Sequence, residues 1–493
     1  MKVRSVIKIF LPAIFYFFLA AQFSFSAEQI SPAPSGPQTD GHFRKIIIDA
    51  DQKTADKLEG ALKDPMELAV AADGRVFYAE RAGTVKMWNP ETKKTIVLGK
   101  LNVFTGLEDG LLGLTLDPNF TTNHWIYLYY ALPETGHDPQ NKKTGVNRVS
   151  RFSISDDKLD LNSEKKLFEV QTQREECCHA GGSLTFDAQG NLYLSTGDNT
   201  NPFASDGFAP IDQRPDRSPW DAEKSAANSN DLRGKILRIH PEPEGNYTIP
   251  KGNLFPPKTE KTRPEIYIMG CRNPFRISVD KKNGYLYWGE VGPDAVQAKE
   301  YRGPAGFDEI NQARQAGNFG WPYFVGDNKA YWDHDFANTN VLKTKFDPAH
   351  PINRSPNNTG VEKLPPAQPS FIQYPNAASI KFPVVNAGGG RTAMAGPVYY
   401  FDPNLKSDRK LPEEFNHTLF IYDWSRNWII AVHLDAAEKI AKMERFCPKM
   451  TFKRPMDMEL GPDGCLYLIE WGTAWGNNKD TQIVRIEYSI DSK

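Results

Sequence analysis

The sequence predicts an all-β protein, a six-bladed β-propeller whose blades are four-stranded antiparallel sheets. A short alternating apolar segment, a turn containing Gly and a second apolar segment centred on Tyr recur along the chain. The 37 Gly, 37 Pro and 12% aromatic residues are typical of many strands joined by tight turns. Few stretches have the residue spacing of an amphipathic helix.

Residues 1–27 are predicted to be a secretory signal peptide. Lys2, Arg4 and Lys8 precede an apolar run, and small residues follow up to Ala27. The run is short for a membrane span, and no later stretch is long and apolar enough for one. We therefore expect a secreted or periplasmic protein with no membrane span in the mature chain.

The charge of the mature chain argues against a nucleic-acid partner. Removing the three cationic residues of the signal peptide changes the net charge from −2 to −5, because residues 1–27 contain no Asp or Glu. A protein that binds nucleic acid usually carries a basic surface.

Residues 28–60 are polar and contain Pro and Gly, so they are predicted to be an N-terminal arm or linker with at most one strand, near residues 46–48. The propeller is predicted over residues 61–490. Its final strand, near residues 483–488, is expected to pair with the first blade and close the ring, which removes free sheet edges.

Six copies of the repeated hairpin predict the six blades. Four copies turn at Asp-Gly, Gln-Gly or Asn-Gly, which supply the positive φ that tight reversals need. Further short strands after the hairpins complete radially arranged sheets. A β-sandwich with an additional domain is the alternative. The copies span residues 68–78, 114–129, 184–194, 277–287, 397–432 and 458–468.

Two long insertions interrupt the repeats, at residues 201–231 and 326–384. Both are rich in Asn, Asp, Pro and aromatic residues. We expect ordered loops that lie over one face of the propeller and shape a substrate pocket.

Several common functional motifs are absent from the sequence. There is no Gly-x-Gly-x-x-Gly after a strand, no Gly-Lys-Ser, no His-Glu-x-x-His, no Cys-x-x-Cys and no Gly-x-Ser-x-Gly. Nucleotide binding, ordinary zinc chemistry and a serine-hydrolase elbow are therefore disfavoured.

Loop segments beside the repeated strands carry the polar residues of a candidate site. The segments are Glu108-Asp109-Gly110, Cys178-His179-Ala180-Gly181-Gly182, Arg272-Asn273-Pro274, Glu290-Val291-Gly292-Pro293, Asp308-Glu309-Ile310-Asn311 and Gly317-Asn318-Phe319-Gly320-Trp321-Pro322. In their order and spacing they resemble the soluble glucose/sorbosone dehydrogenase family, calcium-dependent six-bladed propellers that use pyrroloquinoline quinone (PQQ). The resemblance runs from about residue 65 to 487.

The resemblance implies that His179 is the general base, for which a neutral imidazole suits, since its ordinary pKa is about 6.5. The alternative is a His that only hydrogen-bonds a blade turn. Arg272 and Asn273 resemble the pair that contacts the cofactor, where a guanidinium stabilises developing negative charge. A structural Arg272 paired with Glu265 or Glu290 is the alternative.

The resemblance also implies a metal site. Gly292 and Pro293 would offer carbonyl oxygens to Ca²⁺, a cation that takes oxygen ligands. Asp308 and Glu309 are interpreted either as a second, structural calcium site or as a turn that ends a strand ladder. Glu108 would direct its side chain to the cofactor, or would be a surface acid.

Three positions depart from the family pattern. Cys178 stands where glucose-oxidising members carry an acidic residue before the base, so the usual partner for His179 is missing. Ser425 replaces a cofactor-binding lysine, and Met456 replaces one of two arginines, the other being Arg454. The cations that could compensate for these losses are Arg391, Arg426 and Lys453.

The cysteines and tryptophans have alternative interpretations. Cys177 and Cys178 are adjacent, so they form a vicinal bridge or pair elsewhere, and the other three of the five cysteines are interpreted as small buried residues or as disulfide partners. The tryptophans at 424, 428, 471 and 475 are assigned to packing rather than to sugar stacking.

The sequence therefore predicts an exported, calcium-binding quinoprotein that oxidises a sugar or polyol hydroxyl by hydride transfer to PQQ. Its small-molecule substrate and its electron acceptor are not specified further. One alternative is a propeller that binds carbohydrate or a partner without catalysis. Another is a metal-dependent, lactonase-like hydrolase.

Overall fold

Six antiparallel sheets form the blades of a propeller, as predicted. The computed structural model describes residues 38–50, 62–133, 144–339, 344–386, 388–474, 476 and 478–489. The predicted signal peptide lies outside these residues. Among the residues described, no helix has the length and apolar character needed to cross a membrane.

Blades 1 to 3 each begin at their innermost strand. Blade 1 contains β3 (Pro65–Val70), β4 (Val76–Glu80), β5 (Thr84–Asn89) and β6 (Lys94–Lys100). Blade 2 contains β7 (Leu111–Leu116), β8 (Trp125–Ala131), β9 (Thr144–Ser155) and β10 (Lys158–Gln173), with the short helix α1 (Phe120–Asn123) between β7 and β8. Blade 3 contains β11 (Gly181–Phe186), β12 (Leu192–Thr196), β13 (Lys235–Pro241) and β15 (Ile266–Met269), extended by β14 (Tyr247–Thr248) and β19 (Gly317–Asn318).

The other three blades follow the same order. Blade 4 contains β16 (Pro274–Val279), β17 (Leu286–Glu290), β18 (Asp308–Ala313) and β22 (Ile372–Tyr374). Blade 5 contains β23 (Ala393–Tyr399), β24 (Thr418–Asp423), β25 (Trp428–Leu434) and β26 (Ile440–Arg445). Blade 6 contains β27 (Pro455–Leu460), β28 (Leu466–Glu470), β29 (Gln482–Tyr488), β2 (Phe43–Ala50) and β1 (Gln38–Asp40).

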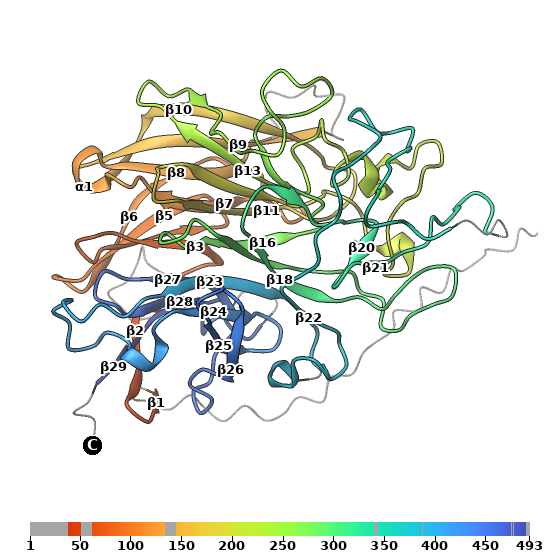
Figure 1. Cartoon of the computed structure of the whole chain (residues 1–493). Coiled ribbons are helices and arrows are strands. Elements are labelled where there is room, and N and C mark those ends of the chain that lie inside the picture. Colours follow the sequence, from red (N-terminus) through yellow and green to blue (C-terminus); the bar gives the residue numbers. More distant parts are fainter. Residues whose placement is uncertain are drawn as a thin grey trace, which may run out of the picture. The chain divides into compact units, whose positions relative to one another are not determined.

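The innermost strands form a ring. Along the chain β3, β7, β11, β16, β23 and β27 each neighbour the next, and β27 returns to β3 (Figure 1). Each begins a hairpin predicted from the repeats. Gly74 and Gly464 turn two of these hairpins with φ of +84° and +74°, a conformation that costs little without a Cβ.

The ring closes differently from the prediction. β29 pairs with β28 and with β2, not with the first blade. The described part of the segment predicted as an arm is therefore built into the sixth blade. Lys45 of β2 donates a hydrogen bond to Glu470 at 3.0 Å, and both side chains are buried. Phe43 packs against Phe415, Phe446 and Tyr488.

The two insertions are ordered where described, and they pack against each other. Asn353 donates hydrogen bonds to the carbonyls of Glu223 and Ala227 at 2.7 and 3.0 Å. Ser355 donates to the buried carboxylate of Asp221 at 2.6 Å. These contacts join the two irregular segments, the first of which is inserted in blade 3 and the second in blade 4. Short pieces within or beside them are η1 (Phe203–Ser205), η2 (Ser218–Trp220), η3 (Ala222–Lys224), β20 (Phe324–Val325), β21 (Lys329–Ala330) and η4 (Pro383–Val385), and η5 (Glu413–Phe415) lies in blade 5.

A buried charge network joins the innermost strands. Arg276 of β16 donates to the carbonyl of Met456 at 3.1 Å and to that of Met66, and lies 3.4 Å from the carboxylate of Asp457. Asp457 of β27 accepts from the backbone N–H of Leu68 at 2.7 Å. Blades 1, 4 and 6 are thereby linked.

Glu67 of β3 extends this network to blades 2 and 3. Its carboxylate accepts the backbone N–H of Leu114 in β7 at 2.6 Å and that of Leu184 in β11 at 3.1 Å. The Ser183 hydroxyl donates to the same carboxylate at 2.5 Å. Burial raises the pKa of Glu67, and the positive charge of Arg276 opposes that rise.

We expect Arg276→Met to lower the free energy of unfolding by about 3–5 kcal/mol, because it leaves the buried carboxylates of Glu67 and Asp457 without their cation. Urea unfolding monitored by tryptophan fluorescence measures the change. Arg409→Met is the matched control, since the Arg409–Asp408 pair is largely exposed and should change stability by less than about 1 kcal/mol. Equal effects of the two substitutions would contradict a structural role for the network.

Candidate functional site

The candidate residues meet where the innermost strands begin. Glu108 precedes β7, His179 precedes β11, Arg272 precedes β16, Arg391 precedes β23 and Arg454 precedes β27. Residues far apart in the sequence are thus presented at the start of equivalent strands in different blades. A rigid scaffold that presents side chains from its loops is a common arrangement for a functional site.

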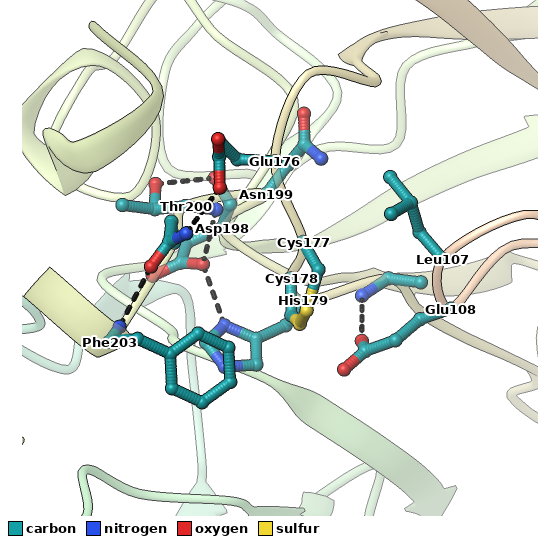
Figure 2. Close-up of a disulfide and its surroundings, with 12 residues drawn as sticks. Leu107, Glu108, Glu176, Cys177, Cys178, His179, Asp198, Asn199, Thr200 and Phe203 are labelled. Atoms are coloured by element: carbon teal, nitrogen blue, oxygen red, sulfur yellow. Dashed lines mark hydrogen bonds and ion pairs between the residues drawn. A yellow bond between two sulfur atoms is a disulfide. The ribbon is translucent and has the colours of Figure 1, made fainter. Parts of the chain in front are cut away.

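His179 is buried and oriented by an acid that the sequence analysis did not identify. Its Nδ1 lies 2.9 Å from Asp198 Oδ1 (Figure 2). Asp198 is completely buried, and its Oδ2 accepts from Trp321 Nε1 at 2.8 Å. A carboxylate at Nδ1 favours the tautomer with its proton there, which leaves Nε2 free to accept a proton. The partner expected at Cys178 is therefore replaced from the end of β12.

Side chains from two neighbouring blades hold the backbone after His179. Glu108 accepts the N–H of Ala180 at 3.0 Å, and Asn273 Oδ1 accepts the N–H of Gly181 at 3.1 Å. A Cβ on Gly197 would lie 2.3 Å from the His179 carbonyl oxygen, so that position has no room for a larger residue. Glu108 and Asn273 thus fix the position of the imidazole.

Arg272 contacts the loop after β17. Its Nη1 donates to the carbonyl of Val291 at 2.8 Å, and its Nη2 donates to Asp294 at 3.2 Å. The ion pair with Glu265 or Glu290 that was considered as an alternative is not formed by this side chain. Arg272 Nε is buried and has no hydrogen-bond partner among the residues that the structure describes.

Glu290 fixes the backbone at Arg272 and Asn273. Its Oε1 accepts the backbone N–H groups of Arg272 and Asn273 at 2.7 and 2.5 Å, and its Oε2 accepts from Trp288 Nε1 at 3.2 Å. Burial raises the pKa of Glu290 to about 8, with the nearby charge of Glu309 acting in the same direction. Glu290 was noted in the sequence only as a possible ion-pair partner.

Arg391 lies on the other side of the same loop. Its Nη2 donates to the Pro293 carbonyl at 2.7 Å, and its Nε is 3.7 Å from Asp308. Its Nε and Nη1 are buried without a hydrogen-bond partner in the described ranges, as is the hydroxyl of Tyr331. Burial raises the pKa of Tyr331, and the positive charges of Arg272 and Arg391 oppose the rise. Arg272, Arg391 and Tyr331 therefore each have a buried donor that is not used in a hydrogen bond.

Arg426 and Arg454 are engaged elsewhere. Arg426 donates to the main-chain carbonyls of Gly390 at 2.8 Å and of Pro375 at 2.8 Å, besides those of Val385 and Asn386. Arg454 donates to the Ala474 carbonyl at 3.0 Å. Its guanidinium lies over the rings of Trp424 and Trp471, at 4.5 and 5.8 Å from their centroids. The Trp424 and Trp471 rings thus pack around a cation, whereas Trp428 is part of the core and Trp475 lies outside the described residues.

The residues predicted for two calcium sites, Gly292 with Pro293 and Asp308 with Glu309, take part in hydrogen bonds within the chain. Asp308 accepts the N–H groups of Gly292 and Ala393 at 3.1 and 2.9 Å, whereas Glu309 accepts from Gly326 at 2.5 Å and Asn311 at 2.9 Å. Neighbouring residues of a strand point to opposite faces, so the Asp308 and Glu309 side chains lie on opposite sides of the sheet. The Pro293 carbonyl already accepts from Arg391.

The cysteines adopt one of the arrangements considered. Cys177 and Cys178 form a vicinal disulfide directly before His179 (Figure 2). Cys271, Cys447 and Cys465 are buried free thiols, in agreement with their interpretation as small buried residues.

Comparison with known proteins identifies the family. A family model described as Glucose / Sorbosone dehydrogenase matches residues 62–364. The chain belongs to the glucose/sorbosone dehydrogenase family. The resemblance of the loop segments to this family is thereby confirmed.

Individual relatives agree with this assignment. The chain is 28% identical to Aldose sugar dehydrogenase YliI of Escherichia coli over 58% of its length, and that match spans 65% of the relative, just under two thirds. It is 24% identical to Quinoprotein glucose dehydrogenase B of Acinetobacter calcoaceticus, with 85% of each chain covered. The PQQ-bound Aldose Sugar Dehydrogenase of Streptomyces coelicolor has the same fold, with a TM-score of 0.54 at 18% identity over 92% of this chain and 99% of the other.

The raised pKa of Glu290 predicts a pH dependence of stability. Between its ordinary value of 4.5 and about 8, the folded chain retains a proton that the unfolded chain releases, so this contribution is full below pH 4.5 and is lost as the pH rises through 8. Urea midpoints measured from pH 5 to 8 should fall more steeply for the unmodified protein than for Glu290→Gln. Parallel pH profiles for the two proteins would contradict the assignment.

Proposed function

We propose that this protein is an exported quinoprotein dehydrogenase that oxidises a hydroxyl group of a sugar or polyol, with PQQ as the bound oxidant. The observations that carry the proposal are the buried His179–Asp198 pair and the guanidinium groups of Arg272 and Arg391, which retain unused donors. A base and a set of cationic donors in one place suit removal of a proton together with transfer of negative charge.

The donor set suits PQQ. Buried polar groups normally have hydrogen-bond partners, so the unused donors of Arg272, Arg391 and Tyr331 favour a ligand rich in acceptor oxygens. PQQ carries carboxylates and quinone oxygens, and when bound it supplies the group that accepts hydride. Arg272 and Arg391 would hold these oxygens by charge-assisted hydrogen bonds.

The chain's own residues manage the proton. His179 Nε2 accepts the proton of the substrate hydroxyl as the carbon–hydrogen bond breaks, and Asp198 stabilises the imidazolium that results. Glu108 and Asn273 keep the imidazole in place through the backbone of Ala180 and Gly181. The electrons then leave the protein to an external acceptor.

Calcium has no step in this mechanism. The carboxylates of Asp308 and Glu309 point apart, and Arg391 occupies the carbonyl of Pro293. The positive charge of Arg391 at the Pro293 carbonyl disfavours a second cation beside it.

A non-catalytic propeller that binds carbohydrate or a partner is the second candidate. Ser425 interacts with Thr392 at 2.7 Å, Met456 is uncharged, and Arg426 and Arg454 contact main-chain carbonyls. Of the three cationic positions that family members direct at the cofactor, two are therefore uncharged, at Ser425 and Met456, and the third, Arg454, contacts the main chain. A lactonase-like hydrolase is not favoured, because within the described ranges the residues that could share a metal are Glu108, Cys177 and Cys178.

We expect His179→Ala and Asp198→Asn to lower the rate of sugar-dependent dye reduction by about 10²- to 10⁴-fold in protein loaded with PQQ, because each removes an oriented general base. His350→Ala is the matched control, since His350 is exposed and pairs with Asp347. Absorbance of bound PQQ in each variant shows whether the cofactor site is intact. Unchanged rates in both site variants would reject the catalytic role of the pair.

Cofactor binding should distinguish two arginines of the same region. Arg391→Met should weaken PQQ binding about tenfold or more, because its unused donors are lost. Arg426→Met should leave the affinity within about twofold and lower thermal stability instead, because Arg426 ties loop carbonyls together. Equilibrium titration followed by absorbance measures the affinity. If no PQQ binds to the unmodified protein, the non-catalytic candidate is preferred.

A further inference from the structure

The vicinal disulfide takes no part in the proposed reaction. Cys177 and Cys178 come from the loop before β11, and Glu108 approaches them from the loop before β7 (Figure 2). The two Sγ atoms and a Glu108 carboxylate oxygen all lie within 4.8 Å of one another. The same residues line a pocket together with His179 and Leu107.

We propose that reduction of this disulfide creates a binding site for a thiophilic divalent cation, of which Zn²⁺ is the example, with Cys177, Cys178 and Glu108 as ligands. A dithiol reductant gives two electrons and two protons: the Cys177–Cys178 bond breaks, two cysteine thiols form, and the reductant becomes a disulfide. Binding of the cation then releases the two thiol protons to solvent.

The distances suit such a cation. Zn–S bonds of about 2.3 Å in a tetrahedral site place two thiolate sulfurs about 3.8 Å apart. The existing separation of the three ligand atoms, within 4.8 Å, allows this geometry once the sulfur–sulfur bond has opened. Two thiolates and one carboxylate leave a fourth position open to water.

The third ligand is already positioned. The Glu108 carboxylate is fixed by the N–H of Ala180 at 3.0 Å, so it loses little freedom when a cation binds. The other cysteines, Cys271, Cys447 and Cys465, are buried, and they belong to blades 4, 5 and 6 or the segments beside them. Cys177 and Cys178 therefore differ from the other three cysteines in two ways: they are adjacent to each other, and a carboxylate lies beside them.

A cation at this site would lie in the pocket beside the candidate base, because Cys178 immediately precedes His179 and all four residues line the same pocket. We expect it to lower the rate of dye reduction, because it would lie next to the candidate base. This consequence rests on the proposed function, whereas binding of the cation does not.

The test compares oxidised and reduced forms of the unmodified protein. Protein reduced with a phosphine and desalted under anaerobic conditions is titrated with Cd²⁺, whose thiolate complexes absorb in the ultraviolet. We expect one equivalent to bind to the reduced protein, with the thiolate absorption, and none to give that absorption in the oxidised protein. Because the three buried thiols are free in both forms, the oxidised protein is its own control.

Two variants locate the site. Cys177→Ser/Cys178→Ser should abolish the absorption, and Glu108→Gln should weaken binding about tenfold or more. Cys447→Ser, which removes a buried thiol elsewhere, should bind as the unmodified protein does. The absence of thiolate absorption in the reduced protein, or its persistence in the double variant, would overturn the proposal. Loss of dye reduction on adding Cd²⁺ tests the inhibition separately, so failure of the dehydrogenase proposal leaves the binding result interpretable.

Discussion

The ring depends on charged side chains that are buried where the innermost strands meet. Arg276 contacts blades 1 and 6 from blade 4, and Glu67 contacts blades 2 and 3 from blade 1. Such groups are costly to bury unless their partners remain in place. The network therefore favours one relative position of the blades. The loops of the site lead into these same strands, so the network also determines where the site residues lie.

The polar residues of the site fall into two groups. Glu108, Asn273 and Glu290 spend their hydrogen bonds on backbone N–H groups, and they fix the loops that carry His179 and Arg272. A second group, Arg272, Arg391 and Tyr331, keeps buried donors unused within the described structure. Because the first group fixes the loops, the unused donors of the second group do not move to other hydrogen-bond partners within the protein. Preorganisation of this kind is what binding sites require of a scaffold.

Most of the fold could be predicted because its signals are local. A Gly turn between two alternating segments shows which residues form a hairpin, and six such hairpins indicate six blades. The pairing of β2 with β29 could not be predicted in this way, since it joins segments at opposite ends of the chain. The sequence pattern of β2 reveals a strand but contains no information on its partner.

The site was partly predictable for a related reason. His179, Arg272 and Asn273 stand in recognisable segments, but Asp198 lies 19 residues beyond His179, in the Gly-Asp-Asn sequence that ends a hairpin. The register of β11 and β12 brings His179 and Asp198 together. The hairpin predicted from the repeats therefore contained the signal that Asp198 lies near His179. Arg391 and Arg426 could not be separated by sequence, because their roles differ only in which donors remain unused.

The sixth blade has a consequence for how the chain folds. Lys45 and Glu470, which form a buried ion pair across β2 and β28, are 425 residues apart. Bringing ends together over such a length costs about 5 kcal/mol of chain entropy if nothing between them is ordered. That entropy cost falls as the intervening blades form. The pairing of β2 with blade 6 is therefore favourable only late, after the C-terminal strands have been made. Until then β2 has an unpaired edge. Because β2 is made early and its partner β29 is made last, this edge stays exposed for longer than any other pairing edge when the chain is released in order.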